Sequence, residues 1–174
     1  MRFDPSKIYL HGGPGNLTRD RLVRYGRHGQ DAGALFFTPD TPAGKLYAAA
    51  YASVAKDPAI WKVHIKLHTN DVFDFGRMSH RYRLGKLLSP QEQLAIWRSA
   101  EDTGQIDWPH VDEETMVDAG FGGAILSERS SFAGCIMSVY SIAVFDSNNV
   151  EIVGRVSDAE LARTMQKLNS LRIT

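Results

Sequence analysis

The stretch YLHGG, from Tyr9 to Gly13, places a histidine between a short strand and a glycine-rich turn. FFTPDTPAGKLY follows from Phe36 to Tyr47, and YSIAVFDSNNVEI follows late in the chain, from Tyr140 to Ile152. Glycines let a backbone approach a ligand closely, and a histidine at the end of a strand can donate a hydrogen bond to a ligand hydroxyl. On its own such a histidine is more often structural or merely exposed, so its role depends on the two later segments.

Local signals around these segments predict an α+β domain. Thr41 and Pro42 supply an N-cap and a first-turn proline for a helix, and WKVHIKL at 61–67 alternates as a half-buried strand does. Strands are predicted over 7–10, 34–37, 61–67, 122–126, 141–145 and 151–156, and helices over 18–25, 42–55, 90–104, 112–119 and after Ser157. Helices cluster early and strands late without βαβ alternation, which favours α+β over a doubly wound sheet.

Composition and charge narrow the class of protein. The 174 residues, 43% hydrophobic and 23% charged, fit one soluble globular domain spanning 1–174. The net charge is zero, so no global field favours nucleic acid or a membrane. Apolar runs fall far short of the roughly 18 residues of a spanning helix, and the N-terminus lacks signal-peptide character, so we expect a cytoplasmic protein. Cys135 is the only cysteine, which excludes an intrachain disulfide and favours an inert small hydrophobe.

Charges are segregated along the chain despite the neutral total. Residues 77–86 (RMSHRYRLGK) hold five basic or potentially basic side chains and no acid, whereas residues 99–128 hold eight acids and no lysine or arginine. The simpler interpretation is two solvated faces. The functional interpretation is a phosphate-contacting loop and an acidic surface facing a partner.

Several other candidate sites fail on spacing. His64 and His68 would lie about 13 Å apart in a strand, too far for one metal ion, so we predict no metal site. The GGPGNLT turn lacks the lysine of a phosphate-binding P-loop. Tyr47 and Tyr51 share one helix face, where two aromatic side chains are more often core than cofactor site.

These segments resemble the ADP-ribosyltransferase superfamily, specifically its His-Tyr-acid branch of diphtheria toxin and poly-ADP-ribose polymerase types. His11-Gly12 matches the first family strand, and 36–47 matches a Tyr-Phe strand with a tyrosine eleven residues on. Val144-Phe145-Asp146 and 150–152 match the last strands. The segment 119–125 is similar to a glycine-rich strand of small phage and effector members. The resemblance implies a split antiparallel β-sheet core with peripheral helices.

The chain departs from the family pattern at its acid. The catalytic glutamate of the polymerase type corresponds to Ser141, which cannot offset developing positive charge. Some short family members take an acid from the preceding loop, and there Glu128 is the only acid between Asp118 and Asp146. Glu128 is therefore the candidate substitute, the alternative being an exposed loop glutamate paired with Arg129.

The resemblance also implies a role for each site residue. His11 would donate to a ribose hydroxyl of NAD, and the backbone of Gly12 would hold the carboxamide. Tyr47 would stack on the nicotinamide ring with Tyr51 or another aromatic, and Phe37 would help to bind the cofactor.

The implied activity is NAD-dependent mono-ADP-ribosyl transfer to a macromolecular acceptor, expected to be a protein. A phage or bacterial effector or toxin acting inside a host cell would fit such a chain. Two alternatives remain open from the sequence: a pseudoenzyme that inhibits a protein partner through the acidic stretch and the C-terminal helix, and an NAD glycohydrolase.

Overall fold

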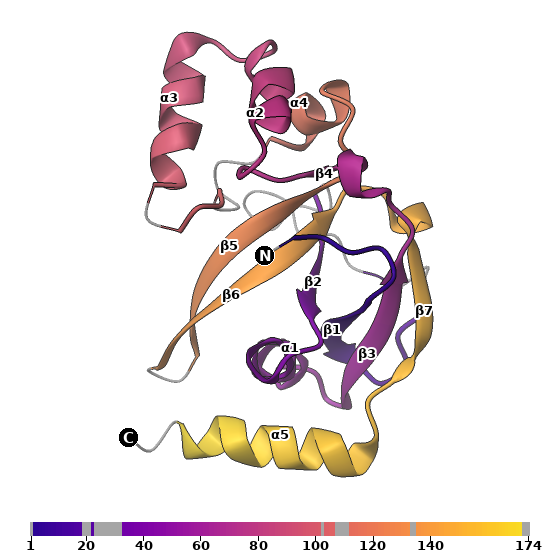
Figure 1. Cartoon of the computed structure of the whole chain (residues 1–174). Helices are drawn as coiled ribbons and strands as arrows, with labels where there is room; N and C mark the ends of the chain where they lie inside the picture. The colour runs from indigo at the N-terminus through magenta and orange to yellow at the C-terminus, as the bar shows by residue number, and fades with distance from the viewer. Residues whose placement is uncertain are drawn as a thin grey trace.

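In the computed structural model, the described residues (2–18, 22, 33–101, 103–106, 112–132 and 135–171) form an α+β arrangement with a seven-stranded sheet and five α-helices (Figure 1). The strands are β1 (Ile8–Pro14), β2 (Leu35–Pro39), β3 (Pro58–Ile65), β4 (Val72–Phe73), β5 (Gly123–Phe132), β6 (Cys135–Val144) and β7 (Val150–Arg155). The helices are α1 (Pro42–Ala52), α2 (Met78–Gly85), α3 (Pro90–Ser99), α4 (Glu113–Asp118) and α5 (Asp158–Ser170).

The sheet is mixed, not wholly antiparallel as expected. Its strand order is β4-β5-β6-β2-β1-β3-β7, and only β4 and β5 run parallel. The long connection between these two strands carries α2, α3 and α4, and it returns the chain to the end of the sheet where β4 began. All other neighbouring strands are antiparallel.

Strand β2 belongs to two parts of the sheet that diverge. Its first three residues, 35–37, pair with β6, whereas Thr38 and Pro39 pair with β1. The β1–β2 pairing ends at Leu10, while β1 continues along β3 to Pro14. Strand β1 therefore separates from β2 at the start of β2, and β6 separates from it at the end of β2.

Helix α1 covers one face of the sheet where β1 and β3 meet. Thr41 caps it by accepting a hydrogen bond from Gly44 N at 3.1 Å, as the Thr-Pro signal predicted. Three consecutive alanines, 48–50, are buried against Leu10 and Ile60, and these small side chains let the helix lie close to the strands.

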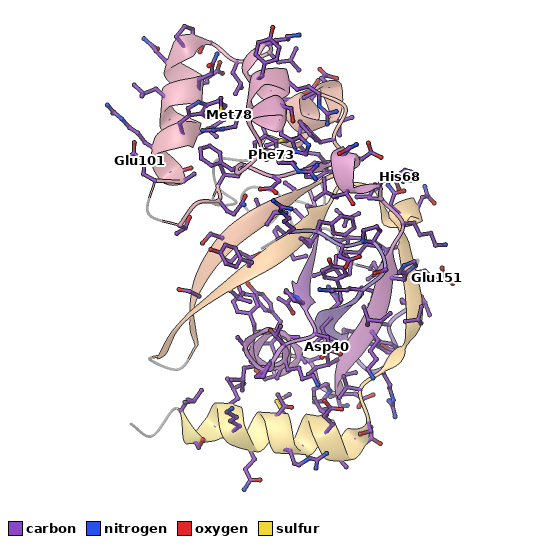
Figure 2. All side chains as sticks on the ribbon, in the orientation of Figure 1. Asp40, His68, Phe73, Met78, Glu101 and Glu151 are labelled. Carbon is purple, nitrogen blue, oxygen red and sulfur yellow. The ribbon has the colours of Figure 1, made fainter. Side chains whose placement is uncertain are left out.

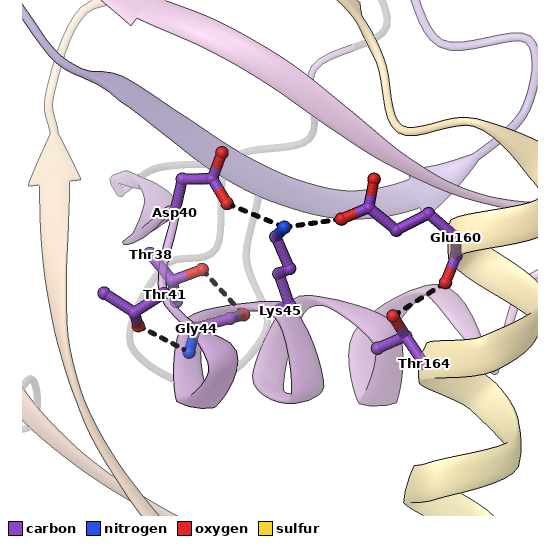
Figure 3. Close-up of polar contacts among 7 residues, drawn as sticks. All are labelled: Thr38, Asp40, Thr41, Gly44, Lys45, Glu160 and Thr164. Atoms are coloured by element: carbon purple, nitrogen blue, oxygen red, sulfur yellow. Dashed lines mark hydrogen bonds and ion pairs between the residues drawn. The ribbon is translucent and has the colours of Figure 1, made fainter.

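Helix α5 packs against α1 through a charged contact as well as apolar ones (Figure 3). Lys45 Nζ lies 3.2 Å from Asp40 Oδ1 and 2.5 Å from Glu160 Oε1. The two carboxylates raise the pKa of Lys45, and Lys45 lowers that of Glu160. Because all three groups are partly exposed, the contact orients α5 more than it stabilises the domain.

The predicted elements are largely confirmed, with differences at their ends. The helix expected over 18–25 lies mostly outside the described residues. Helix α3 ends at Ser99, earlier than expected, and α2 forms where the sequence suggested a basic loop. Strands β5 and β6 are longer than expected and form one hairpin that includes residues assigned to a loop.

No helix in the described part of the chain is both long and apolar enough to cross a membrane.

Candidate functional site

A chain of hydrogen bonds links α1 to the β5–β6 hairpin. Tyr47 Oη donates to Glu128 Oε2, and Ser141 Oγ donates to Glu128 Oε1. Tyr51 Oη lies 3.4 Å from Tyr47 Oη, and the two tyrosine rings have centroids 5.1 Å apart with planes inclined at 52°. We call these four residues the Tyr-Glu-Ser cluster.

Local geometry explains why the four side chains meet. Tyr47 and Tyr51 are four residues apart on α1 and so project from one face of the helix. In the β5–β6 register Leu126 is opposite Ser141 and Glu128 is opposite Val139. Because side chains alternate along a strand, Glu128 and Ser141 lie diagonally on the same face, within reach of a long side chain.

Glu128 is thus in strand β5 and not in a loop, contrary to the sequence expectation. It is half-buried, and its carboxylate contacts Tyr47 and Ser141; it is not the exposed loop residue of the alternative interpretation. Ser141 is fully buried. A carboxylate from the neighbouring strand therefore lies beside the buried hydroxyl of Ser141.

The two tyrosines differ in exposure. Tyr47 is 3% exposed, so its ring is part of the packed interior and its hydroxyl serves Glu128. Tyr51 is 38% exposed and presents the open ring of the pair. The sequence-based expectation gave Tyr47 the role of stacking on a ligand ring. Of the two rings, that of Tyr51 is the more accessible for such a contact.

His11 is buried at the point where β1 parts from β2. Its Nδ1 lies 3.0 Å from Phe36 O, and a carbonyl only accepts, so Nδ1 carries the hydrogen. Burial lowers the pKa of His11, opposed by the bond to Phe36. The neutral ring therefore offers Nε2 as an acceptor, which differs from the donor role that the resemblance implied.

Phe37 is fully buried and its ring centroid is 5.5 Å from that of His11. It belongs to the core that contains Tyr9, Val63 and Ile142, so its side chain is not open to a cofactor. The rings of His11 and Phe37 pack together in this layer.

Gly12 joins β1 to α1 through direct backbone contact. A Cβ atom on Gly12 would lie 1.9 Å from Ala48 O and 2.9 Å from Ala52 N, so no larger residue fits. His11 precedes Gly12 and Tyr47 precedes Ala48, so both residues are next to this backbone contact. Their rings lie in different layers, His11 against Phe37 and Tyr47 toward Glu128.

A cavity of about 710 Å³ opens where β6 parts from β2. Its lining includes Lys7, Tyr9, Asp40, Ala43, Val139 and Tyr140. None of the four residues of the Tyr-Glu-Ser cluster lines this cavity. Its walls come close to the cluster, since Ala43 is one helical turn before Tyr47 and Val139 is the strand partner of Glu128. Its volume lies within the range of small-molecule sites, which is about 300–1,000 Å³.

Tyr140 and Val139 were not predicted as lining residues, because the predicted strands stopped at 126 and began again only at 141, whereas β5 continues to Phe132 and β6 begins at Cys135. The signal was present: from Gly123 to Val144 only Ala133-Gly134 interrupts a run of strand-compatible residues. His64, considered above for a metal, instead donates from Nε2 to Pro5 O at 2.6 Å. No group of three or more potential metal ligands occurs among the residues with described structure.

No protein-family model, curated protein or solved structure matches the chain.

Proposed function

We propose that the chain is an NAD-dependent mono-ADP-ribosyltransferase that cleaves the nicotinamide–ribose bond and passes ADP-ribose to a protein acceptor, with an ADP-ribosyltransferase-like fold. The observation that carries the proposal is the contact of Glu128 with Ser141. This contact places a carboxylate beside residue 141, the position that corresponds to the catalytic glutamate of the family that the sequence resembles. The nearby cavity of about 710 Å³ has room for a nucleotide.

In the proposed reaction the bond from ribose C1′ to the nicotinamide nitrogen breaks, and nicotinamide leaves with the electron pair. Glu128 stabilises the positive charge that develops on the ribose. It also accepts the proton of the nucleophile on the acceptor protein, and this nucleophile then forms the new bond to C1′. Tyr47 and Ser141 hold the two carboxylate oxygens in place, so little reorganisation is needed as charge develops.

The other residues take supporting roles in this proposal. Tyr51 stacks on the nicotinamide ring, since its ring is the more exposed of the two. His11 is given no contact with the ligand, because its ring lies against Phe37, in a different layer from Tyr47 and Glu128. Gly12 keeps β1 against α1 so that its backbone can meet the carboxamide.

The test is release of nicotinamide from NAD⁺, measured by chromatography with and without a protein acceptor. Glu128→Gln keeps the size of the side chain and should lower the rate by a factor on the order of 10² to 10³. Glu101→Gln, the same change at an exposed site outside the cluster, should leave the rate unchanged. Full activity of a folded Glu128→Gln protein would remove Glu128 from the mechanism.

One observation favours a second candidate, a pseudoenzyme that binds a partner without catalysis. Tyr47 and Ser141 are almost fully buried, and both carboxylate oxygens of Glu128 are engaged. A polar network of this kind also serves simply to hold a fold together. No nicotinamide release at any NAD⁺ concentration, together with a melting temperature raised by NAD⁺, would favour this candidate.

A further inference from the structure

A second cavity, of about 390 Å³, lies between α2 and α3, in the group of helices at the far end of the molecule from α5 (Figure 1). Its lining includes Met78, Arg81, Tyr82, Lys86, Gln93 and Trp97. Met78 is labelled between the two helices in Figure 2. We call this cavity the α2–α3 groove. None of its residues belongs to the Tyr-Glu-Ser cluster.

The walls of the α2–α3 groove are held in place by specific contacts. Gln93 Nε2 donates to Gly85 O at 2.9 Å and to Leu88 O at 3.1 Å, which ties α3 to the end of α2. Trp97 packs edge to face on Phe75, with centroids 5.7 Å apart. A capping box at the start of α3 fixes the turn between the helices. The groove is therefore preformed, which lowers the entropic cost of binding.

Apolar side chains are unusually open around this groove. Met78 is 72% exposed and Tyr82 is 69% exposed, and Leu87 and Leu94 are each half exposed nearby. Methionine and aromatic side chains are enriched where proteins bind other proteins, because they offer a large and adaptable apolar contact. The surface is thus suited to receive an apolar side chain.

The residues that line the groove include two cations and no acid. Residues 75–91 contain four lysines and arginines and no acid. None of the four forms an ion pair with another described residue. Two of them have structural partners: Arg83 stacks 3.6 Å from the Phe121 ring centroid, and Arg77 donates to Asn70 Oδ1.

The other two cations line the groove. Arg81 lies 5.1 Å from the centroid of Phe75, and Lys86 lies 4.5 Å from that of Tyr82. These distances are measured from Arg81 Cζ and Lys86 Nζ, so the charged groups themselves lie over the rings. Arg81 Nη2 also donates to Met78 Sδ at 2.6 Å, but neither cation is paired with a described acid.

We propose that the α2–α3 groove binds an acidic segment of a partner protein, one that inserts an apolar or aromatic side chain between carboxylates. The apolar side chain would fill the groove beside Met78 and Trp97, and the carboxylates would pair with Arg81 and Lys86. This proposal does not depend on the NAD chemistry.

A protein segment fits these observations better than a nucleic acid does. Phosphate backbones are bound by rows of cations, whereas only two cations, Arg81 and Lys86, are among the described residues that line the groove. The apolar groove supplies the central anchor typical of protein–peptide contacts.

The test begins with a phage-displayed library of random 12-residue peptides, selected against the full chain. The double variant Arg81→Gln/Lys86→Gln is present as an unlabelled competitor, so that binders to other surfaces are removed. The enriched peptides should share an apolar or aromatic residue flanked by Asp or Glu. A fluorescent copy of one such peptide then serves as the probe for anisotropy, at about 50 and 200 mM salt.

The double variant should weaken binding of this peptide about tenfold or more, and Tyr82→Ala about fivefold. Both changes are at partly or largely exposed residues, so folding is retained. Lys56→Gln, an exposed cation elsewhere, should change the dissociation constant less than twofold. Higher salt should weaken binding to the native chain more than to the double variant.

Three results would overturn the proposal: no enrichment of acidic peptides, equal binding to the double variant, or tighter binding of a 12-nucleotide oligothymidylate than of the peptide. Nicotinamide release by the double variant should equal that of the native chain. The failure of this proposal is therefore separable from the failure of the proposed activity.

Discussion

Ser141 donates a hydrogen bond to Glu128 across two neighbouring strands, although the two residues are thirteen positions apart in the sequence. The turn of the β5–β6 hairpin brings them to the same face of the sheet, and Tyr47 completes the contact from α1. One carboxylate therefore holds a helix and two strands together close to a cavity.

An acid at residue 141 should not improve this site. Ser141→Glu places a second carboxylate beside Glu128 in a buried location, and it should lower the free energy of unfolding by about 2–4 kcal/mol without raising nicotinamide release. Ser138→Glu, at an exposed residue of the same strand, should change stability by less than about 0.5 kcal/mol. Urea denaturation measures both.

The exchanged pair Glu128→Ser/Ser141→Glu should recover much of the stability lost by Ser141→Glu alone, since it again has one carboxylate and one hydroxyl. Recovery of activity in this pair would mean that either strand can supply the acid. Higher activity of Ser141→Glu alone would contradict the role given to Glu128.

The hydroxyl of Tyr47 should matter more for stability than that of Tyr51. Tyr47→Phe removes a buried donor to a carboxylate, which should cost about 1.5–3 kcal/mol of unfolding free energy. Tyr51→Phe keeps the ring and loses the 3.4 Å contact with Tyr47 Oη, and it should cost less than about 0.5 kcal/mol. Equal losses would show that the bond to Glu128 does not stabilise the fold.

Tyr51→Ala should instead act on the proposed ligand. Removing the more exposed ring should raise the KM for NAD⁺ more than it lowers kcat, because stacking is made in the bound ground state. A change in kcat alone would argue against stacking on Tyr51.

The close approach of β1 and α1 should make Gly12 intolerant of any side chain. Gly12→Ala places a carbon 1.9 Å from Ala48 O, a backbone atom that cannot move alone, and should cost about 3 kcal/mol or more. Gly154→Ala in β7 is the matched control, since a Cβ there meets nothing within 4 Å. Thermal unfolding of the two variants distinguishes packing from a general effect of replacing glycine.

Stability should fall as the solution becomes acidic, and His80 should be one cause. Asp74 N donates to His80 Nδ1 at 3.0 Å, so protonation breaks a buried hydrogen bond. Burial, first, and then Arg77 and Arg83 lower the pKa of His80, against an opposing effect of Asp74. The pKa of buried His11 is lowered as well.

For both histidines the unfolded chain binds protons more readily than the folded one. Their contribution is therefore fully present above the unfolded pKa of about 6.5 and is lost as the pH falls below it. His80→Asn keeps an acceptor near Nδ1 but does not titrate, so the dependence of unfolding free energy on pH between about 7.5 and 5.5 should become shallower. An unchanged slope would exclude His80 as a contributor.

Local sequence signals were sufficient to predict most of the helices and strands. Thr41 and Pro42 started α1, and Ser157 capped α5 as predicted. Gly120, at φ +79°, followed the end of α4. These features depend on groups within about four residues of one another, which the sequence displays directly. The strand over 61–67 was equally clear from its alternation.

The site itself depended on contacts that no local pattern contains. The sequence alone determined that the chain is α+β, which residues begin its helices, and that Tyr47 and Tyr51 share a face. Only the tertiary structure decided that Glu128 meets Ser141, that His11 carries its hydrogen on Nδ1, and that Tyr51 rather than Tyr47 is open. Helix caps and alternation arise from bonding between adjacent turns or residues, whereas strand register, burial and tautomer are set by partners far away along the chain.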